Sequence, residues 1–190
     1  IQKLHYNKFD TKKIDKRGGL PVPNIVFNTI TFETQEKYDS FCAMGDKSNG
    51  FSFEWIVPSP KTREECDEEY LIAEKGEKSA AAMGIIPKKE RPWFNWYKWQ
   101  CENWGTKWDA YDDLDENDEH TGFFRDEQRT IAFNTAWSPP FPVYQRMAEL
   151  SLAFNFSWLS EPYGGTSGKG HSEDGEIVID EEYEEEDDEE

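Results

Sequence analysis

The chain has 190 residues, which suits one domain with terminal extensions, and 40 acidic against 21 basic residues give it a formal net charge of −19. This charge argues against direct binding to nucleic acid or to an anionic membrane, because both need clustered Lys and Arg, and it favours basic protein partners. Aromatic residues make up 15% of the chain, too many for a disordered acidic protein, so a hydrophobic core is expected.

The N-terminal part opens with a basic extension, residues 1–22. β-branched and aromatic residues predict a first strand over Asn24–Phe32. Thr34 is a candidate N-cap for a short helix that ends at Gly45. A second strand is predicted at Phe51–Val57.

A helical insertion is predicted over about residues 60–104. The capping box Thr62–Glu65 opens a charged helix. A later helix carries one aromatic stripe and ends at Gly105. The stripe consists of Trp93, Trp96, Tyr97, Cys101 and Trp104.

Two further strands are predicted at Lys107–Asp113 and Thr130–Trp137, joined by an acidic loop. Prolines then break the chain and lead into a helix with Val143, Met147 and Leu150 on its buried side. The next strand alternates, with Phe154, Phe156 and Trp158 pointing inward.

The C-terminal part, residues 164–190, is interpreted as a Gly-rich flexible linker followed by an acidic tail, so the domain proper covers residues 23–163. The linker covers residues 164–170, and Ile177–Ile179 is predicted as a short edge strand. Nine of the ten residues of Glu181–Glu190 are acidic.

In order, these elements read β-α-β, a helical insertion and β-β-α-β. That order predicts an α+β fold of the ferredoxin-like type, with an antiparallel sheet and helices on one face.

Most of the tryptophans are expected in the core. The predicted core tryptophans are Trp93, Trp96, Trp104, Trp108 and Trp137. Trp99 lies off the helical stripe and is therefore the candidate for an exposed aromatic anchor that contacts a partner. A stacking platform for bases is the alternative, but the basic and aromatic strand motif of ferredoxin-like RNA-binding domains is absent.

Two motifs stand out. The glycine motif is Asn103-Trp104-Gly105-Thr106-Lys107-Trp108-Asp109-Ala110, and the proline motif is Thr135-Ala136-Trp137-Ser138-Pro139-Pro140. Together with the strand from Pro23 to Phe32, they resemble the YubB-type ferredoxin-like domain family of phages, plasmids and other mobile elements. The resemblance covers roughly residues 22–185. It implies the same fold and a mobile-element background, and it assigns no activity.

A search for catalytic and ligand-binding patterns leaves no candidate. His5, His120 and His171 lie in polar segments and have no metal-ligand spacing to one another or to Cys. The acidic run from Asp112 to Glu119 starts like an EF-hand loop but lacks its glycine and its closing glutamate. Residues 164–170 have the wrong spacing for a phosphate-binding loop. No catalytic residue, cofactor or metal is therefore predicted, and the protein is expected not to be an enzyme.

Three cysteines, an odd and widely spaced set, predict reduced and mostly buried thiols. No apolar run approaches the roughly 20 residues of a membrane span, and no signal peptide opens the chain. Together with the mobile-element resemblance, these features predict a cytoplasmic protein of a bacterial host.

The first functional hypothesis is a non-enzymatic inhibitor that binds a basic, nucleic-acid-handling host defence protein, such as a CRISPR effector or a restriction nuclease, by nucleic-acid mimicry. Carboxylates along an extended strand recur every ~3.4 Å, comparable to the phosphate rise along one DNA strand. The predicted partner-binding acidic residues are Asp112, Asp113, Asp115, Glu116, Asp118, Glu119, Glu181, Glu182, Glu184, Glu185, Glu186, Asp187 and Asp188.

The second hypothesis is a general protein-interaction module of a phage or plasmid, which binds through Trp99 and other aromatic surface or through a sheet edge, while the acidic tail serves solubility. The third is an enzyme or a conditional nucleic-acid binder whose basic residues are masked by the acidic tail. Those basic residues are Lys88, Lys89, Arg91, Lys98 and Lys107.

Overall fold

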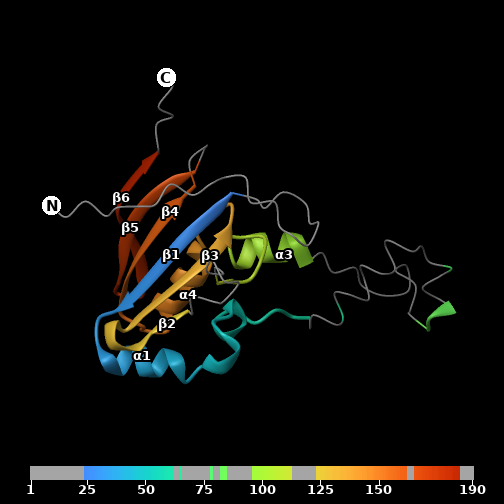
Figure 1. Cartoon of the computed structure of the whole chain (residues 1–190), viewed down its shortest axis with the longest axis horizontal. Helices are drawn as coiled ribbons and strands as arrows, with labels where there is room; N and C mark the ends of the chain where they lie inside the picture. The colour runs from blue at the N-terminus through green and yellow to red at the C-terminus, as the bar shows by residue number, and fades with distance from the viewer. Residues whose placement is uncertain are drawn as a thin grey trace, which may run out of the picture.

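The computed structural model describes residues 24–61, 96–112, 123–161 and 165–184, with the isolated positions 65, 78 and 82–84. Within them, six strands form one antiparallel sheet in the order β2-β3-β1-β4-β5-β6 (Figure 1). The strands are β1 (Ile25–Phe32), β2 (Phe124–Arg125), β3 (Thr130–Ala136), β4 (Phe154–Ser160), β5 (Thr166–Glu173) and β6 (Glu176–Glu184). The helices are α1 (Gln35–Cys42), α3 (Trp96–Asn103) and α4 (Phe141–Glu149), with short 3-10 helices η1 (Lys47–Asn49), η2 (Phe53–Trp55) and η4 (Asp126–Gln128).

The strand order confirms the ferredoxin-like prediction. Strand β1 lies between β3 and β4 and pairs antiparallel with both. The chain therefore forms two interleaved split β-α-β units, β1–α1–β2 and β3–α4–β4. The hairpin of β5 and β6 extends this four-stranded unit beyond β4.

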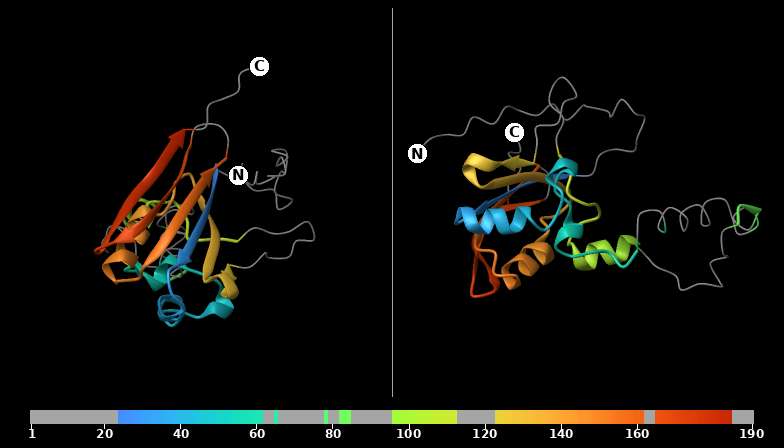
Figure 2. Two further views of the ribbon diagram at one scale, coloured as in Figure 1. Left: turned by 90° about the vertical axis from the view of Figure 1, so that its left-hand side faces the viewer. Right: turned by 90° about the horizontal axis from the view of Figure 1, so that it is seen from below.

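Helices α1, α3 and α4 lie on one face of the sheet, and the core fills the space between them and the strands (Figure 2). Burial alternates along β1, so that every second residue from Val26 to Phe32 faces the helices. The predicted inward alternation along β4 is confirmed, since Phe154, Phe156 and Trp158 are all buried. No described helix covers the opposite face, which we call the open face of the sheet (Figure 2).

The predicted start of α1 and the predicted end of α3 are confirmed, whereas α1 ends at Cys42 rather than at Gly45. The Thr34 hydroxyl accepts a hydrogen bond from the backbone N–H of Lys37 and caps α1. Helix α3 ends just before Gly105, whose φ of +79° is the left-handed conformation that glycine tolerates. Most of the predicted helical insertion, including its capping box, lies outside the described residues.

The predicted strand at Phe51–Val57 is wrong: this segment contains the 3-10 helix η2. Phe51, Phe53 and Ile56 are all buried. In a strand, residues 53 and 56 would point to opposite faces, so one buried face could not cover both. The Ser52 hydroxyl caps the turn by accepting from the N–H of Glu54. The second strand of the fold is instead the two-residue β2.

The predicted strand at Lys107–Asp113 is also wrong. Its sole backbone pairing with the sheet in the described residues is an isolated bridge between Tyr111 and Asn134. The Asp109 side chain accepts hydrogen bonds from Ser52 and from Phe53 of η2, which ties the segment to η2. Strand β2 pairs with β3 in its place.

The predicted flexible linker at residues 164–170 is wrong as well, because most of it belongs to β5. Gly168 and Gly170 lie beneath the rings of Trp158 and Phe156, where a Cβ would come within 2.7 Å of a ring carbon. These glycines let the neighbouring aromatic rings cover the strand. The predicted short edge strand is confirmed but longer, since β6 also includes the start of the acidic tail.

Candidate functional site

The glycine motif and the proline motif, which are about 30 residues apart in sequence, lie side by side. The Thr106 hydroxyl donates to the carbonyl oxygen of Ala136 across 2.8 Å, and the Ser138 hydroxyl donates to the carbonyl oxygen of Gly105. Trp104 anchors the first motif in the core, where its indole N–H donates to the carbonyl oxygen of Val57 at 2.9 Å. These hydrogen bonds hold the two motifs against each other, and the buried Trp104 ring anchors them to the core.

A buried polar network supports the proline motif from beneath. The Asn28 amide donates to Thr135 Oγ1 at 2.9 Å and to the Val26 carbonyl oxygen, and Tyr144 Oη donates to Asn28 Oδ1 at 3.0 Å. Thr135 Oγ1 in turn donates to the carbonyl oxygen of Ser138. Complete burial raises the pKa of Tyr144 well above its usual value, so this hydroxyl stays a donor. The network makes the turn after β3 rigid.

The conformation of Trp137 contradicts its predicted place in the core. The backbone of Trp137 has a φ of +74°, a left-handed conformation that is rare for a bulky residue and costs about 1–3 kcal/mol. Its backbone N–H donates to the Asn24 carbonyl oxygen at 2.8 Å, and its side chain is 47% exposed. The left-handed turn rotates this ring off the inward face that Ile131, Phe133 and Thr135 share.

Trp108, also predicted to be core, is 38% exposed. Lys107 connects these two rings: its Nζ lies 4.9 Å from the ring centroid of Trp108 and 5.0 Å from that of Trp137. Both distances fall within the ~6 Å range of cation–π interactions. Among the residues that the structure describes, no carboxylate pairs with Lys107. We call these three side chains the tryptophan–lysine cluster.

Asp109 fixes the position of the glycine motif relative to η2. Its carboxylate accepts hydrogen bonds from the Ser52 hydroxyl at 2.6 Å, from the Phe53 N–H at 2.7 Å and from the Ala110 N–H at 2.8 Å. Burial raises the pKa of Asp109, and the three donors oppose this shift. Because its oxygens are used within the fold, Asp109 positions Trp108 and its neighbours.

Trp99, the predicted exposed anchor, is half-buried instead. Its ring packs edge-to-face on Trp104 with ring centroids 5.5 Å apart, and it belongs to the periphery of the core. The helix turns this ring toward the protein, while Tyr97 of the predicted inward stripe is 41% exposed. The exposed aromatic surface near the motifs therefore consists of Trp108 and Trp137, which sequence alternation placed inside.

The acidic residues predicted to bind a partner are divided between two places. Asp112 lies beside β3, and residues 113–119 fall outside the described part of the chain. Glu181, Glu182 and Glu184 belong to β6, and residues 185–188 are not described. Strand β6 ends the sheet on one side, so the described acidic residues of the tail lie on an edge strand.

Most described side chains of β6 are exposed, whereas Ile177 packs against the core. Two residues of the strand pair with the neighbouring strand β5. Glu181 forms an ion pair with Lys169 at 3.0 Å, and Asp180 contacts the His171 ring at 3.0 Å. The hydrogen bond to Asp180 raises the pKa of His171. Asp180 has no paired residue on β5, which marks a β-bulge there. Glu182 remains an exposed carboxylate on the opposite side of the strand.

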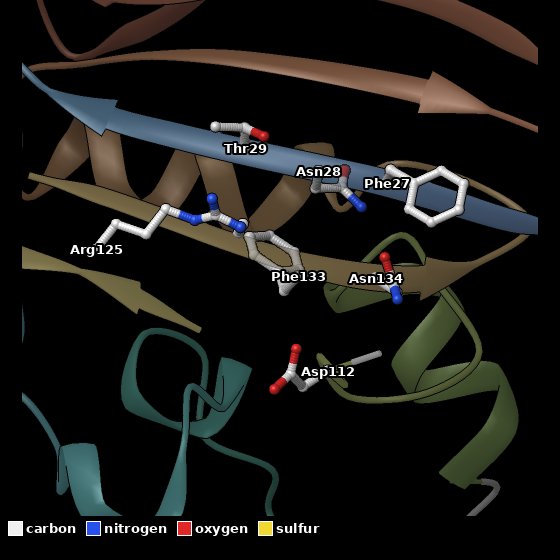
Figure 3. Close-up of a pocket in the computed structure, with 8 residues that line it drawn as sticks. Phe27, Asn28, Thr29, Asp112, Arg125, Phe133 and Asn134 are labelled. Carbon is white, nitrogen blue, oxygen red and sulfur yellow. The ribbon is translucent and has the colours of Figure 1, made fainter. Parts of the chain in front are cut away.

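The open face of the sheet carries two shallow hollows that share Thr29. The smaller, about 140 Å³, lies over β1 and β3, and both Asp112 and Arg125 line it (Figure 3). The larger, about 350 Å³, lies over β1, β4 and β5. It is lined by Thr29, Thr31, Asn155, Phe156, Ser157, Lys169, Gly170 and Asp180. Arg125 shares the smaller hollow with Asp112, and Lys169 shares the larger one with Asp180, so neither hollow is a purely basic surface.

A separate polar cluster lies where α1 meets η4. Both Lys47 and the Tyr38 hydroxyl donate to the Asp126 carboxylate. These hydrogen bonds, chiefly that from Lys47, lower the pKa of Asp126. Cys42 lies beside Tyr38, and burial raises the pKa of its thiol, which keeps it protonated near neutral pH. This cluster joins two elements and holds no activated nucleophile.

Cys42 and Cys101 are free and partly buried. Within the described ranges, no group of three or more His, Cys, Asp or Glu side chains has an arrangement that would hold a metal ion. None of the helices in the same ranges has the length and apolar character needed to cross a bilayer.

Comparison with known proteins adds one match. The family model described as "Ferredoxin-like domain in Api92-like protein" matches residues 103–190. The matched range includes both motifs, α4 and strands β2 to β6, and it starts after β1. No curated protein and no solved structure matches the chain. The comparison and the sheet topology together identify a ferredoxin-like domain.

Proposed function

We propose that this chain is a non-enzymatic protein of a phage or another mobile element, of the YubB type. It binds a basic surface on a host nucleic-acid-handling protein, such as a CRISPR effector or a restriction nuclease, and inhibits that protein in the host cytoplasm. The mobile-element assignment rests on the resemblance of the two motifs. The preference for a basic partner rests on the net charge of −19.

The observation that carries the proposal is the acidic edge strand β6. Successive side chains of a strand point to opposite faces at a rise of about 3.4 Å, so Glu181 and Glu182 present carboxylates on both sides of one extended backbone. Phosphates follow one another along a DNA strand at about the same rise. An edge strand also leaves one flank without a neighbouring strand, so a groove that accepts a nucleic-acid strand has access to both rows of carboxylates.

The test compares two variants with the same change in net charge. In the first, Glu181, Glu182 and Glu184 are replaced by Gln; in the control, the exposed residues Glu33, Glu36 and Glu127 are replaced by Gln. Each variant and the unchanged protein are used to capture partners from a bacterial lysate, and the captured protein is then purified and assayed for nucleic-acid binding.

We expect the unchanged protein and the control to retain a nucleic-acid-handling protein that high salt releases, and to compete with its nucleic acid. The β6 variant should lose both effects. If the β6 variant retains and inhibits the same partner as the control does, the acidic strand is not the binding surface and the proposal is wrong.

The second candidate function is a protein-interaction module that binds through its aromatic surface without mimicry of charge. The exposed rings of Trp108 and Trp137 favour it. A partner that stays bound at high salt and is lost on Trp137→Asn would support this candidate over the first.

A further inference from the structure

The tryptophan–lysine cluster has the composition of a cation-binding site. We propose that Trp108 and Trp137 form a two-walled aromatic cage for a cationic side chain of the partner, and that Lys107 fills this cage in the free protein. The inference deepens the proposed function and rests on it for the partner, because it names the chemical group on a basic partner that this chain recognises. The cage itself is testable with a peptide, without that partner.

The electrostatics of the cluster favour a cation. The face of an indole ring carries negative potential, and Trp binds cations better than the other aromatic residues do. Lys107 Nζ lies 4.9 and 5.0 Å from the two ring centroids, so one ammonium group contacts both walls. Acidic residues outnumber basic ones by 40 to 21 in this chain, yet no described carboxylate pairs with Lys107. Within the described residues, the two rings are therefore the groups that contact this charge.

Hydrogen bonds hold the backbone at both walls, at Trp108 through its neighbour Asp109, whereas the Lys107 side chain is held less firmly. Trp137 is held in a strained left-handed conformation by its bond to Asn24 and by the hydrogen bonds of the proline motif. A strained backbone that displays a large exposed ring points to a role in binding, because packing alone would favour burial of that ring. Lys107 has a flexible stem, and no hydrogen bond to another described residue holds its ammonium. A partner cation therefore meets preformed walls and displaces a weakly held side chain.

The cage lies at the end of the sheet where the acidic strand finishes. Strand β3 ends next to the start of β1, β4 ends there, and β6 ends opposite the start of β5. Four strand spacings of about 4.8 Å separate β3 from β6, which is roughly 19 Å. A basic partner that contacts the end of β6 is therefore close enough to insert a side chain into the cage.

The alternative ligand for the same residues is an anionic planar molecule. A nucleobase would stack on a ring and its phosphate would pair with Lys107. The two readings differ in the role of Lys107, which competes with a cation but attracts an anion. Removal of Lys107 consequently changes binding in opposite directions.

The experiment follows the indole N–H resonances of ¹⁵N-labelled full-length protein at 150 mM salt, assigned with Trp108→Phe and Trp137→Phe. The probes are an octapeptide of alternating Arg and Gly, the same peptide with Gln in place of Arg, and adenosine monophosphate. Lys107→Ala empties the cage, and Lys98→Ala is the control with the same charge change on an exposed lysine. Trp137→Asn removes one wall, since Asn tolerates the left-handed backbone; circular dichroism checks its fold.

We expect the arginine peptide, and not the glutamine peptide, to shift the resonances of Trp108 and Trp137. Relative to Lys98→Ala, Lys107→Ala should tighten binding about fivefold, and Trp137→Asn should weaken it at least tenfold. The inference is overturned if neither indole responds, if Lys107→Ala weakens binding, or if adenosine monophosphate shifts the indoles and loses this effect in Lys107→Ala.

The proposal of the cage and the proposal of charge mimicry can be refuted separately. The β6 variant with three Gln substitutions should keep its indole shifts with the arginine peptide, because four strand spacings separate β6 from β3. Loss of capture by that variant with unchanged indole shifts supports both proposals. Indole shifts without any salt-dependent partner would uphold the cage and refute charge mimicry.

Discussion

Replacing Tyr144 by Phe removes one hydroxyl from the core and leaves Asn28 Oδ1 without its donor. Tyr144 is fully buried and Asn28 is 2% exposed, so water does not replace the lost bond. The aromatic ring remains, and with it the apolar burial. The expected cost is therefore that of one unsatisfied buried acceptor, about 1–3 kcal/mol. For a chain of this size, each kcal/mol lowers Tm by about 2–4 °C.

The assay is urea unfolding followed by circular dichroism and tryptophan fluorescence, with the m-value checked for constancy. Tyr183→Phe is the control, because Tyr183 is 55% exposed and its substitution should change stability by less than about 0.5 kcal/mol. In an Asn28→Val background the orphaned acceptor no longer exists, so the cost of Tyr144→Phe should fall below about 0.5 kcal/mol. A cost near zero in the native background, or an equal cost in both backgrounds, would refute this account of the network.

Three further predictions concern stability. Gly168→Ala should destabilise the protein by about 1–3 kcal/mol in urea unfolding, because its Cβ would lie 2.7 Å from the Trp158 ring and 2.3 Å from a backbone oxygen; a neutral result would contradict the close packing of β5. Asp109 has a raised pKa in the folded state, so its contribution to stability should fall as pH rises from about 4 through that pKa, and the difference in unfolding free energy between wild type and Asp109→Asn should shrink over this range. Asp126 has a lowered pKa because Lys47 and Tyr38 donate to it, so the wild type should exceed Asp126→Asn in stability above about pH 4 and lose this advantage as pH falls; an unchanged difference down to pH 2 would show that these bonds add nothing.

Local patterns predicted the elements that obey one rule along the chain. The alternation in β1 and β4 and the capped start of α1 were all visible in sequence, because each depends on neighbouring residues alone. The hairpin of β5 and β6 also has a local signal in the sequence. Asp174-Gly175 is the favoured dipeptide of a two-residue hairpin turn, and both residues have the positive φ that such a turn requires. The glycines of residues 164–170 favoured the interpretation as a flexible linker, although most of these residues belong to β5.

The candidate site was predicted in part. The sequence singled out both motifs and the acidic residues of β6, but it placed Trp108 and Trp137 in the core and Trp99 at the surface. The positive φ of Trp137 caused the main error, since one left-handed residue reverses the side that alternation assigns. Such a conformation in a tryptophan has no signature in the sequence.

The sequence by itself determined the ferredoxin-like class, the acidic character and the two motifs, because composition and periodicity follow from the order of residues. Tertiary structure alone decided which strand pairs with β3, which rings are exposed and where Lys107 lies. These features depend on contacts between residues far apart in the chain, such as Thr106 with Ala136 and Asn28 with Tyr144. The free energy of those contacts selects one local conformation over others that neighbouring residues allow equally well.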